Sequence, residues 1–199
     1  MERRCSFWFV RHGETQWNIE DKIQGHTDSP LTDLGLKQAQ DLVEQLRGRD
    51  FKKVYTSDLP RAKTTAEIFA KELGLELEET EFLRERNFGP YEGTSKENLS
   101  LLETLEEKGQ DFGDVGVEIN KSIVERFTTF LKEKAAMHPG ESILVVTHGG
   151  VMRIMLLRLK FLNREQLQPS AIGNGAVIKL AVSGDQINVE EVIDVNISG

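Results

Sequence analysis

The sequence predicts an α/β fold with a mostly parallel sheet, helices on both of its faces and an antiparallel strand or hairpin at the C-terminal end. Short apolar runs alternate with amphipathic stretches along the chain, which is typical of a parallel sheet covered by helices. Residues 142–147 (Ser-Ile-Leu-Val-Val-Thr) are the clearest buried strand. Residues 176–182 and 186–193 flank Ser183-Gly184-Asp185 and predict the closing hairpin.

The first predicted element is a fully buried strand at residues 5–10. Its sequence is too apolar and aromatic for an exposed segment and too short for a typical helix. A long polar loop follows, and Leu31-Thr32-Asp33 then opens a helix that Gly48 is placed to end. The apolar residues that recur at helical spacing in this helix are Leu34, Ala39, Leu42, Val43 and Leu46.

Residues 52–56 predict the second strand. The helix after it can be capped by Ser57 or Asp58, tolerates Pro60 in its first turn and continues to Gly74. Residues 76–79 predict a weaker third strand. The first half of the chain therefore has the order β-α-β-α-β.

The second half begins with an irregular segment at residues 83–93, whose two glycines, proline and four charged residues exclude a regular core element. Residues 94–118 are polar and acidic, and we interpret them as an insertion that covers the sheet. An amphipathic helix at 118–137 and an apolar helix at 151–162 flank the strand at 142–147. Because neither a repeat nor a linker interrupts the pattern, we expect one domain over residues 1–199.

Composition limits the classes of partner. The 199 residues include 25 Lys and Arg against 33 Asp and Glu, a net charge of −8 without an extended basic stripe, so nucleic acid is not an expected partner. The single cysteine, Cys5, cannot form an intramolecular disulfide, which favours a cytoplasmic location. Neither a signal-peptide core nor a run of about 18 apolar residues is present, so we expect a soluble protein without a membrane partner.

Polar side chains follow three of the predicted strands. His12 comes after the first strand, Arg61 opens the helix after the second, and His148 follows the strand at 142–147. Because the carboxyl ends of parallel strands form the ligand crevice of such sheets, we expect these residues at one edge. A lone histidine there is more often a loop residue with a structural role, but Arg11 beside His12 and the converging partners favour a functional site.

The residue types at this edge suit a phosphoryl group. Guanidinium groups match phosphate oxygens, and the N–H groups of helix N-termini add donors. A histidine nitrogen can attack phosphorus and form a phosphohistidine without a metal. The leaving oxygen needs a proton, for which Glu85 and Glu92 are candidates. Zinc is not expected, because the arginines would repel a cation and no third ligand is evident.

Five motifs, in order, carry a resemblance to a known family. They are Arg11-His12-Gly13-Glu14-Thr15 with Trp17-Asn18, Gly25 through Pro30-Leu31-Thr32 to Gly35, Ser57-Asp58-Leu59 before Arg61, Leu83 to Glu85 with Phe88-Gly89 and Glu92-Gly93, and Thr147-His148-Gly149. Together they resemble the histidine phosphatase superfamily, also called the phosphoglycerate-mutase-like family. A lone Arg-His-Gly tripeptide is a weak signal, whereas five ordered motifs over most of the chain are specific.

The resemblance implies a three-layer α/β/α sandwich, with no cofactor and no metal. It implies that His12 is the nucleophile and that Glu85 is the proton donor. Arg11, Arg61 and His148 would bind the phosphoryl group. Asn18, Thr27 and Gly149 would bind the phosphate or the substrate, the last through its backbone N–H. We interpret Glu92 as structural.

The leading hypothesis is a metal-independent phosphatase that acts on a small phosphorylated metabolite. The alternatives are a cofactor-dependent phosphoglycerate mutase and a non-catalytic phosphate-binding regulatory module. A mutase must retain a bisphosphate, which calls for cations in the cover. Residues 94–118 carry only Lys96 and Lys108 against seven acidic residues, so we expect water to be the usual acceptor.

Three further polar residues receive lesser interpretations. We interpret His26 as a solvated loop residue, and His138, which precedes Pro139, as exposed. Gly173-Asn174-Gly175 resembles half of a dinucleotide fingerprint, but a strand follows it instead of a helix. We expect Asn174 to support the site from behind.

Overall fold

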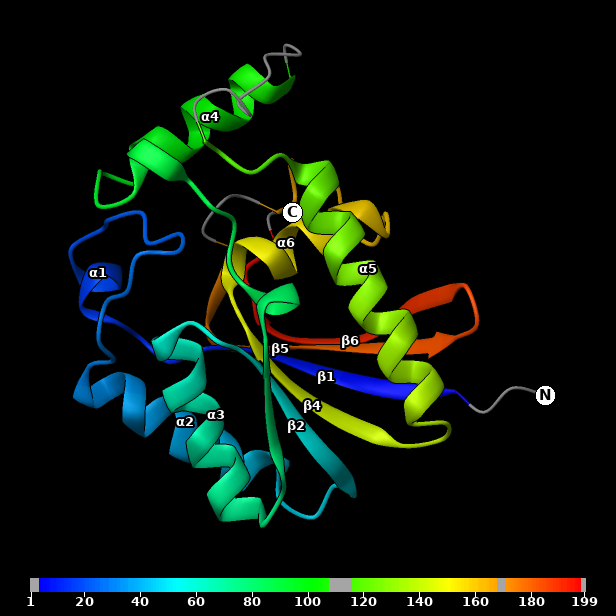
Figure 1. Ribbon diagram of the computed structural model, residues 1–199. Helices are drawn as coiled ribbons and strands as arrows, with labels where there is room; N and C mark the ends of the chain where they lie inside the picture. Colours follow the sequence, from blue (N-terminus) through cyan, green and yellow to red (C-terminus); the bar gives the residue numbers. More distant parts are fainter. Residues whose placement is uncertain (1–3, 108–115, 168–170, 198–199) are drawn as a thin grey trace.

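The protein, a computed structural model that describes residues 4–107, 116–167 and 171–197, is built on one six-stranded sheet in the order β3-β2-β4-β1-β5-β6 (Figure 1). The strands are β1 (Cys5–Arg11), β2 (Phe51–Ser57), β3 (Leu77–Thr80), β4 (Ser142–Thr147), β5 (Ile172–Ser183) and β6 (Gln186–Val195). The first four strands in the sheet order pair in parallel, and β5 and β6 pair antiparallel. The predicted fold class is therefore confirmed.

Helices cover both faces of the sheet (Figure 1). Helices α2 (Asp33–Leu46) and α3 (Pro60–Leu73) pack on one face, and α5 (Asn120–Met137) and α6 (Gly149–Arg158) pack on the other. Side chains alternate across β1, so that Phe7 and Phe9 join the α5–α6 core while Trp8 and Val10 join the α2–α3 core. This two-sided burial is the reason for the nearly continuous apolar sequence of β1.

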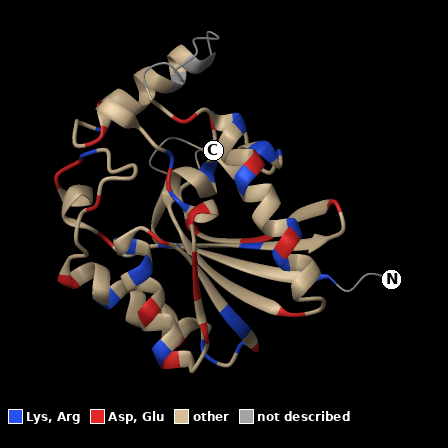
Figure 2. Ribbon diagram, in the orientation of Figure 1, with Lys and Arg blue, Asp and Glu red and all other residues tan. Residues whose placement is uncertain are grey.

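Charge is distributed as this layering requires. The central strands β1 and β4 are nearly free of charged residues, and Lys, Arg, Asp and Glu are spread over the helices and loops around them (Figure 2). Burial on both faces leaves no position in the middle of these strands where a charge would reach water. The polar residues that follow the two strands, His12 and His148, stand at the carboxyl edge of the sheet and are themselves still buried.

The boundaries of several elements differ from the predicted ones. The polar loop after β1 contains a short helix, α1 (Gln16–Ile19), which Thr15 and Asn18 stabilise through a reciprocal capping box. Helix α6 begins at Gly149 and ends at Arg158, instead of spanning 151–162, because His148 already occupies the N-cap position. The short 3-10 helix η1 (Glu81–Leu83) ends where the segment predicted as irregular begins, and a second one, η2 (Gly89–Tyr91), lies inside that segment.

One apolar residue departs from the helical pattern, and one burial prediction is wrong. Leu34 lies on the outer side of α2 and is 51% exposed, whereas the next residue, Gly35, faces the backbone of Glu14. His138 is not exposed: its side chain is 15% accessible and folds back onto the sheet. Its Nε2 is 2.9 Å from the Tyr55 hydroxyl, and its Nδ1 is 2.8 Å from Glu141.

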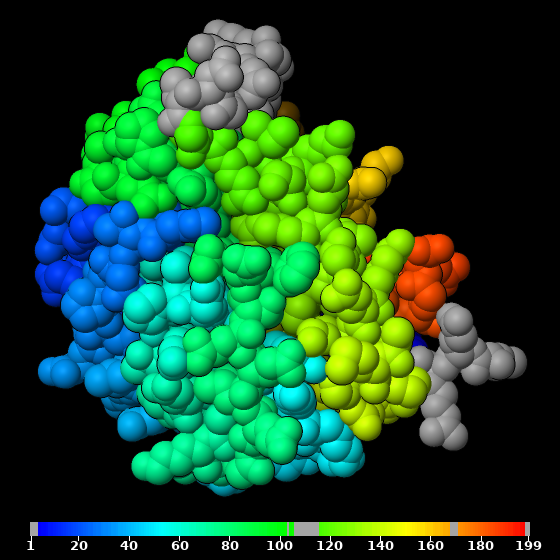
Figure 3. All heavy atoms as spheres, in the orientation of Figure 1, coloured from blue at the N-terminus to red at the C-terminus, as the bar shows by residue number. Residues whose placement is uncertain are grey.

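The predicted insertion contains α4 (Glu97–Glu107), which lies beyond the edge of the sheet (Figure 1). Its entry is fixed to the loop after α1 by backbone hydrogen bonds between Ile23 and Thr94 and between Gly93 and Ile23, each 2.8 Å long. In Figure 3 the green surface of α4 accordingly lies against the blue surface of that loop. Lys108, Asp111 and Asp114 fall outside the described residues.

No helix in the described ranges is both long enough and apolar enough to cross a membrane.

Candidate active site

A cavity of about 540 Å³ opens where β1 and β4 end, and most of the predicted site residues line it. These residues are Arg11, His12, Asn18, Arg61, Glu85 and Gly149. His148 is fully buried beside them, with its ring centroid 5.2 Å from that of His12. Thr27 is not among the lining residues; its hydroxyl donates to Glu92 instead. The sheet topology thus brings together residues more than 130 positions apart.

His12 is held in one orientation. Its Nδ1 lies 2.8 Å from the carbonyl oxygen of Gly13, and because a carbonyl can only accept, Nδ1 carries the hydrogen. The lone pair is therefore on Nε2. Burial, followed by the positive charges of Arg61 and Arg11, lowers the pKa of His12 well below its usual value. The imidazole is accordingly neutral at pH 7.

His148 is the N-cap residue of α6 and stands behind His12. Burial is the main cause that lowers its pKa far below the ordinary value, and the charge of Arg61 and the neighbouring His12 add to it. Within the described residues, neither of its ring nitrogens has a hydrogen-bond partner. A neutral imidazole in this position can donate one hydrogen bond to a group bound between the two rings.

Two guanidinium groups flank the histidines, that of the buried Arg61 and that of the half-buried Arg11. Arg11 donates from Nη1 to the carbonyl oxygen of Ile172, and burial lowers its pKa to about 10. Arg61 donates to the carbonyl oxygens of Thr27 at 3.1 Å and Gly25 at 2.6 Å, and burial likewise lowers its pKa. Both cations are fixed by backbone contacts, so the site can attract an anion without first ordering flexible side chains.

Glu85 is fixed at the N-terminus of α6. Its carboxylate accepts hydrogen bonds from the backbone N–H groups of Gly150 at 3.0 Å, Val151 at 3.1 Å and Arg86 at 2.9 Å. A Cβ at position 150 would lie 2.5 Å from a Glu85 carboxylate oxygen, so a side chain there would displace the carboxylate from these hydrogen bonds. The close approach of helix and carboxylate thus explains the second glycine of the His-Gly-Gly sequence.

Glu92 organises the loop that Arg61 binds. It accepts from the backbone N–H groups of His26 at 2.9 Å, Thr27 at 2.8 Å and Phe88 at 3.1 Å. Burial opposes ionisation of this carboxyl, but the hydrogen bonds, that of the Thr27 hydroxyl foremost, lower its pKa overall. These contacts agree with the structural interpretation of Glu92.

His26 corrects the sequence interpretation. It is half-buried, and its Nε2 lies 2.9 Å from the carbonyl oxygen of Glu85. The side chain therefore braces the backbone of the predicted proton donor instead of extending into water. The reason is that Glu92 folds the loop of His26 against the irregular segment, a contact between residues 66 positions apart.

The site also depends on residues behind it. Asn174 donates from Nδ2 to the carbonyl oxygen of His12 at 3.0 Å and to Asn18 at 3.2 Å, so its expected supporting position is confirmed. The Thr65 hydroxyl accepts from the N–H of Gly13 at 3.2 Å. Sequence reasoning missed Thr65, since a threonine inside an amphipathic helix gives no signal of its own.

No group of three His, Cys, Asp or Glu side chains in the described part of the chain is arranged to hold a metal ion.

Comparison with known proteins places this geometry in a family. A model of the histidine phosphatase superfamily (branch 1) matches residues 7–195. Phosphoglycerate mutase-like protein 4 of Arabidopsis thaliana is 42% identical over 76% of this chain and 69% of its own. A metal-independent phosphoserine phosphatase of the same plant is 38% identical over 75% of this chain and 66% of its own.

A solved structure agrees. The crystal structure of phosphoglycerate mutase from Bacillus anthracis superimposes with a TM-score of 0.83 at 26% identity, over 98% of this chain and 94% of that one. The motifs, the fold and the family match lead to one conclusion: the chain belongs to the histidine phosphatase superfamily, branch 1, and is a phosphatase.

Proposed function

We propose that the protein hydrolyses small phosphorylated metabolites without a metal, by transferring the phosphoryl group to Nε2 of His12. The observation that carries this proposal is the state of His12: a neutral imidazole, anchored through Nδ1 to the Gly13 carbonyl and lying in one cavity with Arg11 and Arg61. A neutral nitrogen with a free lone pair is a nucleophile, and the adjacent cations hold the anion that it attacks.

In the first step His12 Nε2 bonds to phosphorus and the bond from phosphorus to the leaving oxygen breaks. Glu85 in its protonated form gives its proton to that oxygen, so that a neutral alcohol departs. Arg11, Arg61 and His148 donate hydrogen bonds to the phosphoryl oxygens, where negative charge develops. The N–H of Gly149, in the first turn of α6, adds a donor at the positive end of the helix.

In the second step the Glu85 carboxylate takes a proton from water, and the resulting hydroxide attacks the phosphohistidine. The bond from phosphorus to Nε2 breaks, inorganic phosphate forms, and both His12 and Glu85 return to their starting states. Asn18 lines the cavity, which supports the proposal that it contacts the phosphate or the substrate. Thr27 acts indirectly. Its hydroxyl donates to Glu92, and its backbone carbonyl oxygen accepts a hydrogen bond from Arg61 and so helps to position that guanidinium group.

Phosphoglycerate mutase activity is the second candidate, because the chain superimposes on a mutase. The acidic cover argues against it, unless cations from outside the cover supply the positive charge that a second phosphate needs. Arg4, Arg84 and Arg86 are three arginines that lie outside the cover. Arg4 pairs with Glu190 and Arg84 pairs with Asp58, both away from the cavity. Arg86, which lies outside the cover, lines a cavity next to the one at His12 and therefore adds positive charge near the substrate. Hydrolysis remains our proposal, because the sequence of the cover is predominantly acidic.

The test is turnover of p-nitrophenyl phosphate and an alkyl phosphate in the presence of a chelator, combined with trapping. Protein denatured in alkali during turnover should retain phosphate that acid releases, and His12→Ala should retain none. Turnover that requires a divalent metal, or that survives in His12→Ala, would overturn the proposal. Absence of turnover with intact phosphate binding would favour the regulatory module.

A further inference from the structure

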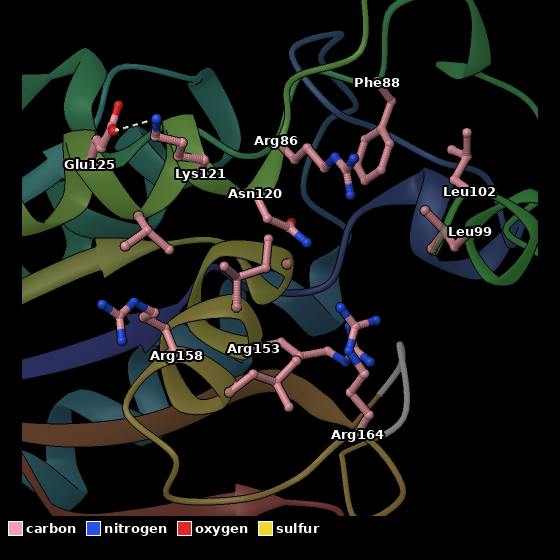
Figure 4. A pocket seen from close by; sticks show the side chains of 14 residues that line it. Arg86, Phe88, Leu99, Leu102, Asn120, Lys121, Glu125, Arg153, Arg158 and Arg164 are labelled. Atoms are coloured by element: carbon pink, nitrogen blue, oxygen red, sulfur yellow. Dashed lines mark ion pairs between the residues drawn. The ribbon is translucent and has the colours of Figure 1, made fainter. Parts of the chain in front are cut away.

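A second cavity, of about 620 Å³, adjoins the active site. The two cavities share Phe88, Leu99 and Gly150 as lining residues, so a molecule bound at His12 can extend from one into the other. The second cavity lies between α4, α5, α6 and the segment that carries Glu85 (Figure 4). None of the predicted site residues lines it, although Gly150, which does, directly follows the predicted Gly149.

Part of its wall is apolar. Leu99 and Leu102 come from α4, Val124 comes from α5, and Ile154 and Leu157 come from α6. Apolar lining of this kind stabilises a bound group by removing its hydrocarbon surface from water. A volume of this size is typical of sites for drug-sized ligands and exceeds what a three-carbon leaving group would fill.

The remaining wall is strongly basic. In Figure 4 Arg86 and Arg164 point toward the same space from opposite sides, Arg153 points toward it from α6, and the amide of Asn120 faces it from α5. Arg86 and Arg153 are only 4% and 5% exposed. Arg153 is anchored by a 2.8 Å hydrogen bond from Nε to the carbonyl oxygen of Leu167, and the Arg86 guanidinium lies 5.5 Å from the centre of the Phe88 ring.

Two other cations of this cavity belong to a different part of it. Lys121 pairs with Glu125 at 3.8 Å, and in Figure 4 this pair and Arg158 lie on the far side, away from the three arginines. The basic character is thus concentrated where Arg86, Arg153 and Arg164 meet. Guanidinium groups match the geometry of carboxylate and phosphate oxygens, so an oxyanion that reaches this corner of the cavity can accept charge-assisted hydrogen bonds from more than one of them.

We propose that this second cavity binds the leaving group, and that the preferred substrate is a phosphomonoester whose alcohol part has an apolar body ending in a second oxyanion, a carboxylate or a phosphate. The inference rests on the proposed function. The phosphoryl group to be cleaved lies at His12, the apolar body lies along the leucines and Ile154, and the distal oxyanion lies among Arg86, Arg153 and Arg164. Specificity then comes from a part of the substrate that does not react.

The test compares matched benzyl esters. Benzyl phosphate supplies the apolar body alone, 4-carboxybenzyl phosphate adds a carboxylate, and 1,4-bis(phosphonooxymethyl)benzene adds a phosphate. We expect one or both of the charged esters to exceed benzyl phosphate about tenfold in kcat/KM, as a charge-assisted contact implies. The better of the two identifies the preferred oxyanion. O-phosphoserine, whose carboxylate is too close to the ester, should be a poorer substrate than either.

The variant Arg164→Gln should remove most of this preference, because it deletes one exposed guanidinium without disturbing the core. Arg158→Gln is the matched control: it makes the same charge change on α6, but its side chain points away, so the preference should stay at the wild-type value. The inference would be overturned if the wild-type protein did not prefer either charged ester over benzyl phosphate. It would also be overturned if the wild-type protein and Arg164→Gln preferred the charged esters equally.

Binding separates this inference from the proposed function. Calorimetry with 4-carboxybenzylphosphonate and benzylphosphonate, which cannot be hydrolysed, needs no catalysis. If no ester is hydrolysed, the proposed function fails, but tighter binding of the carboxylated phosphonate that is lost in Arg164→Gln still supports the oxyanion site. If benzyl phosphate is hydrolysed while the two phosphonates bind equally, the function stands and the oxyanion site is refuted.

Discussion

The substitution Glu85→Gln should separate proton transfer from geometry. The amide keeps the shape of the carboxylate but cannot deliver a proton to the leaving oxygen. General acid catalysis contributes about 10²–10⁴-fold, or roughly 3–5 kcal/mol of activation free energy. A p-nitrophenolate leaves without a proton, whereas an alkoxide does not. We therefore expect the ratio of kcat/KM for benzyl phosphate to that for p-nitrophenyl phosphate to fall by about 10²–10⁴-fold.

The structure adds a second, substrate-independent loss. The two carboxylate oxygens accept from the N–H groups of Gly150 and Val151, and the nitrogen of a glutamine amide cannot accept. One backbone donor loses its acceptor, at a cost of about 1–3 kcal/mol that affects both substrates alike. Both rates should therefore fall, but the benzyl ester should fall much further.

The assay is phosphate release from both esters in a chelator, at one pH near neutral. Glu92→Gln serves as the control, because Glu92 holds the backbone around Thr27 and is not the expected proton source. Its two rates should fall by similar factors. Equal losses in Glu85→Gln would refute the assignment, and a leaving-group dependence confined to Glu92→Gln would move the acid to that residue.

The remaining predictions address the nucleophile, the packing, the pH response and the acceptor. His12→Ala should abolish turnover and the acid-labile phosphate while the circular dichroism spectrum stays that of a folded protein; substantial residual activity would exclude His12 as the nucleophile. Gly13→Ala should destabilise the fold by about 2–4 kcal/mol in denaturant titration, because its Cβ would lie 2.2 Å from the Gly35 carbonyl oxygen, whereas Gly173→Ala, with its nearest atom at 3.4 Å, should stay within about 1 kcal/mol. The pKa values of His12 and His148 are lowered in the folded state, so the unfolded chain binds more protons below about pH 6.5. The free energy of unfolding should therefore fall as the pH falls, by at most about 1.4 kcal/mol per pH unit for each histidine. In His148→Gln this dependence on pH should be weaker, and a free energy of unfolding that rises on acidification would contradict the reasoning. Finally, 3- and 2-phosphoglycerate should interconvert little, even with a bisphosphoglycerate primer. Isomerisation faster than phosphate release would show that the acidic cover does not prevent retention of a bisphosphate.

The sequence by itself determined the layering of the fold and the chemistry of the site. Strands such as Ser142–Thr147 are buried on both faces, so their apolar character is visible in the residues themselves. The positions directly after them are the first that can hold a polar side chain, which is why His12 and His148 could be recognised. The short motifs around these positions then pointed to phosphoryl chemistry.

Only the tertiary structure decided which polar groups meet. Thr27 donates to Glu92, His26 braces the Glu85 backbone and Thr65 lies under Gly13, each across more than 50 positions of sequence. The hydrophobic pattern of a helix tells which face is buried, but it does not tell which distant side chain that face contacts. Arg153 illustrates this: its charge is conspicuous among the apolar residues in the middle of α6, yet its place beside Arg86 follows only from the packing of α6 against α5 and against the segment that carries Glu85.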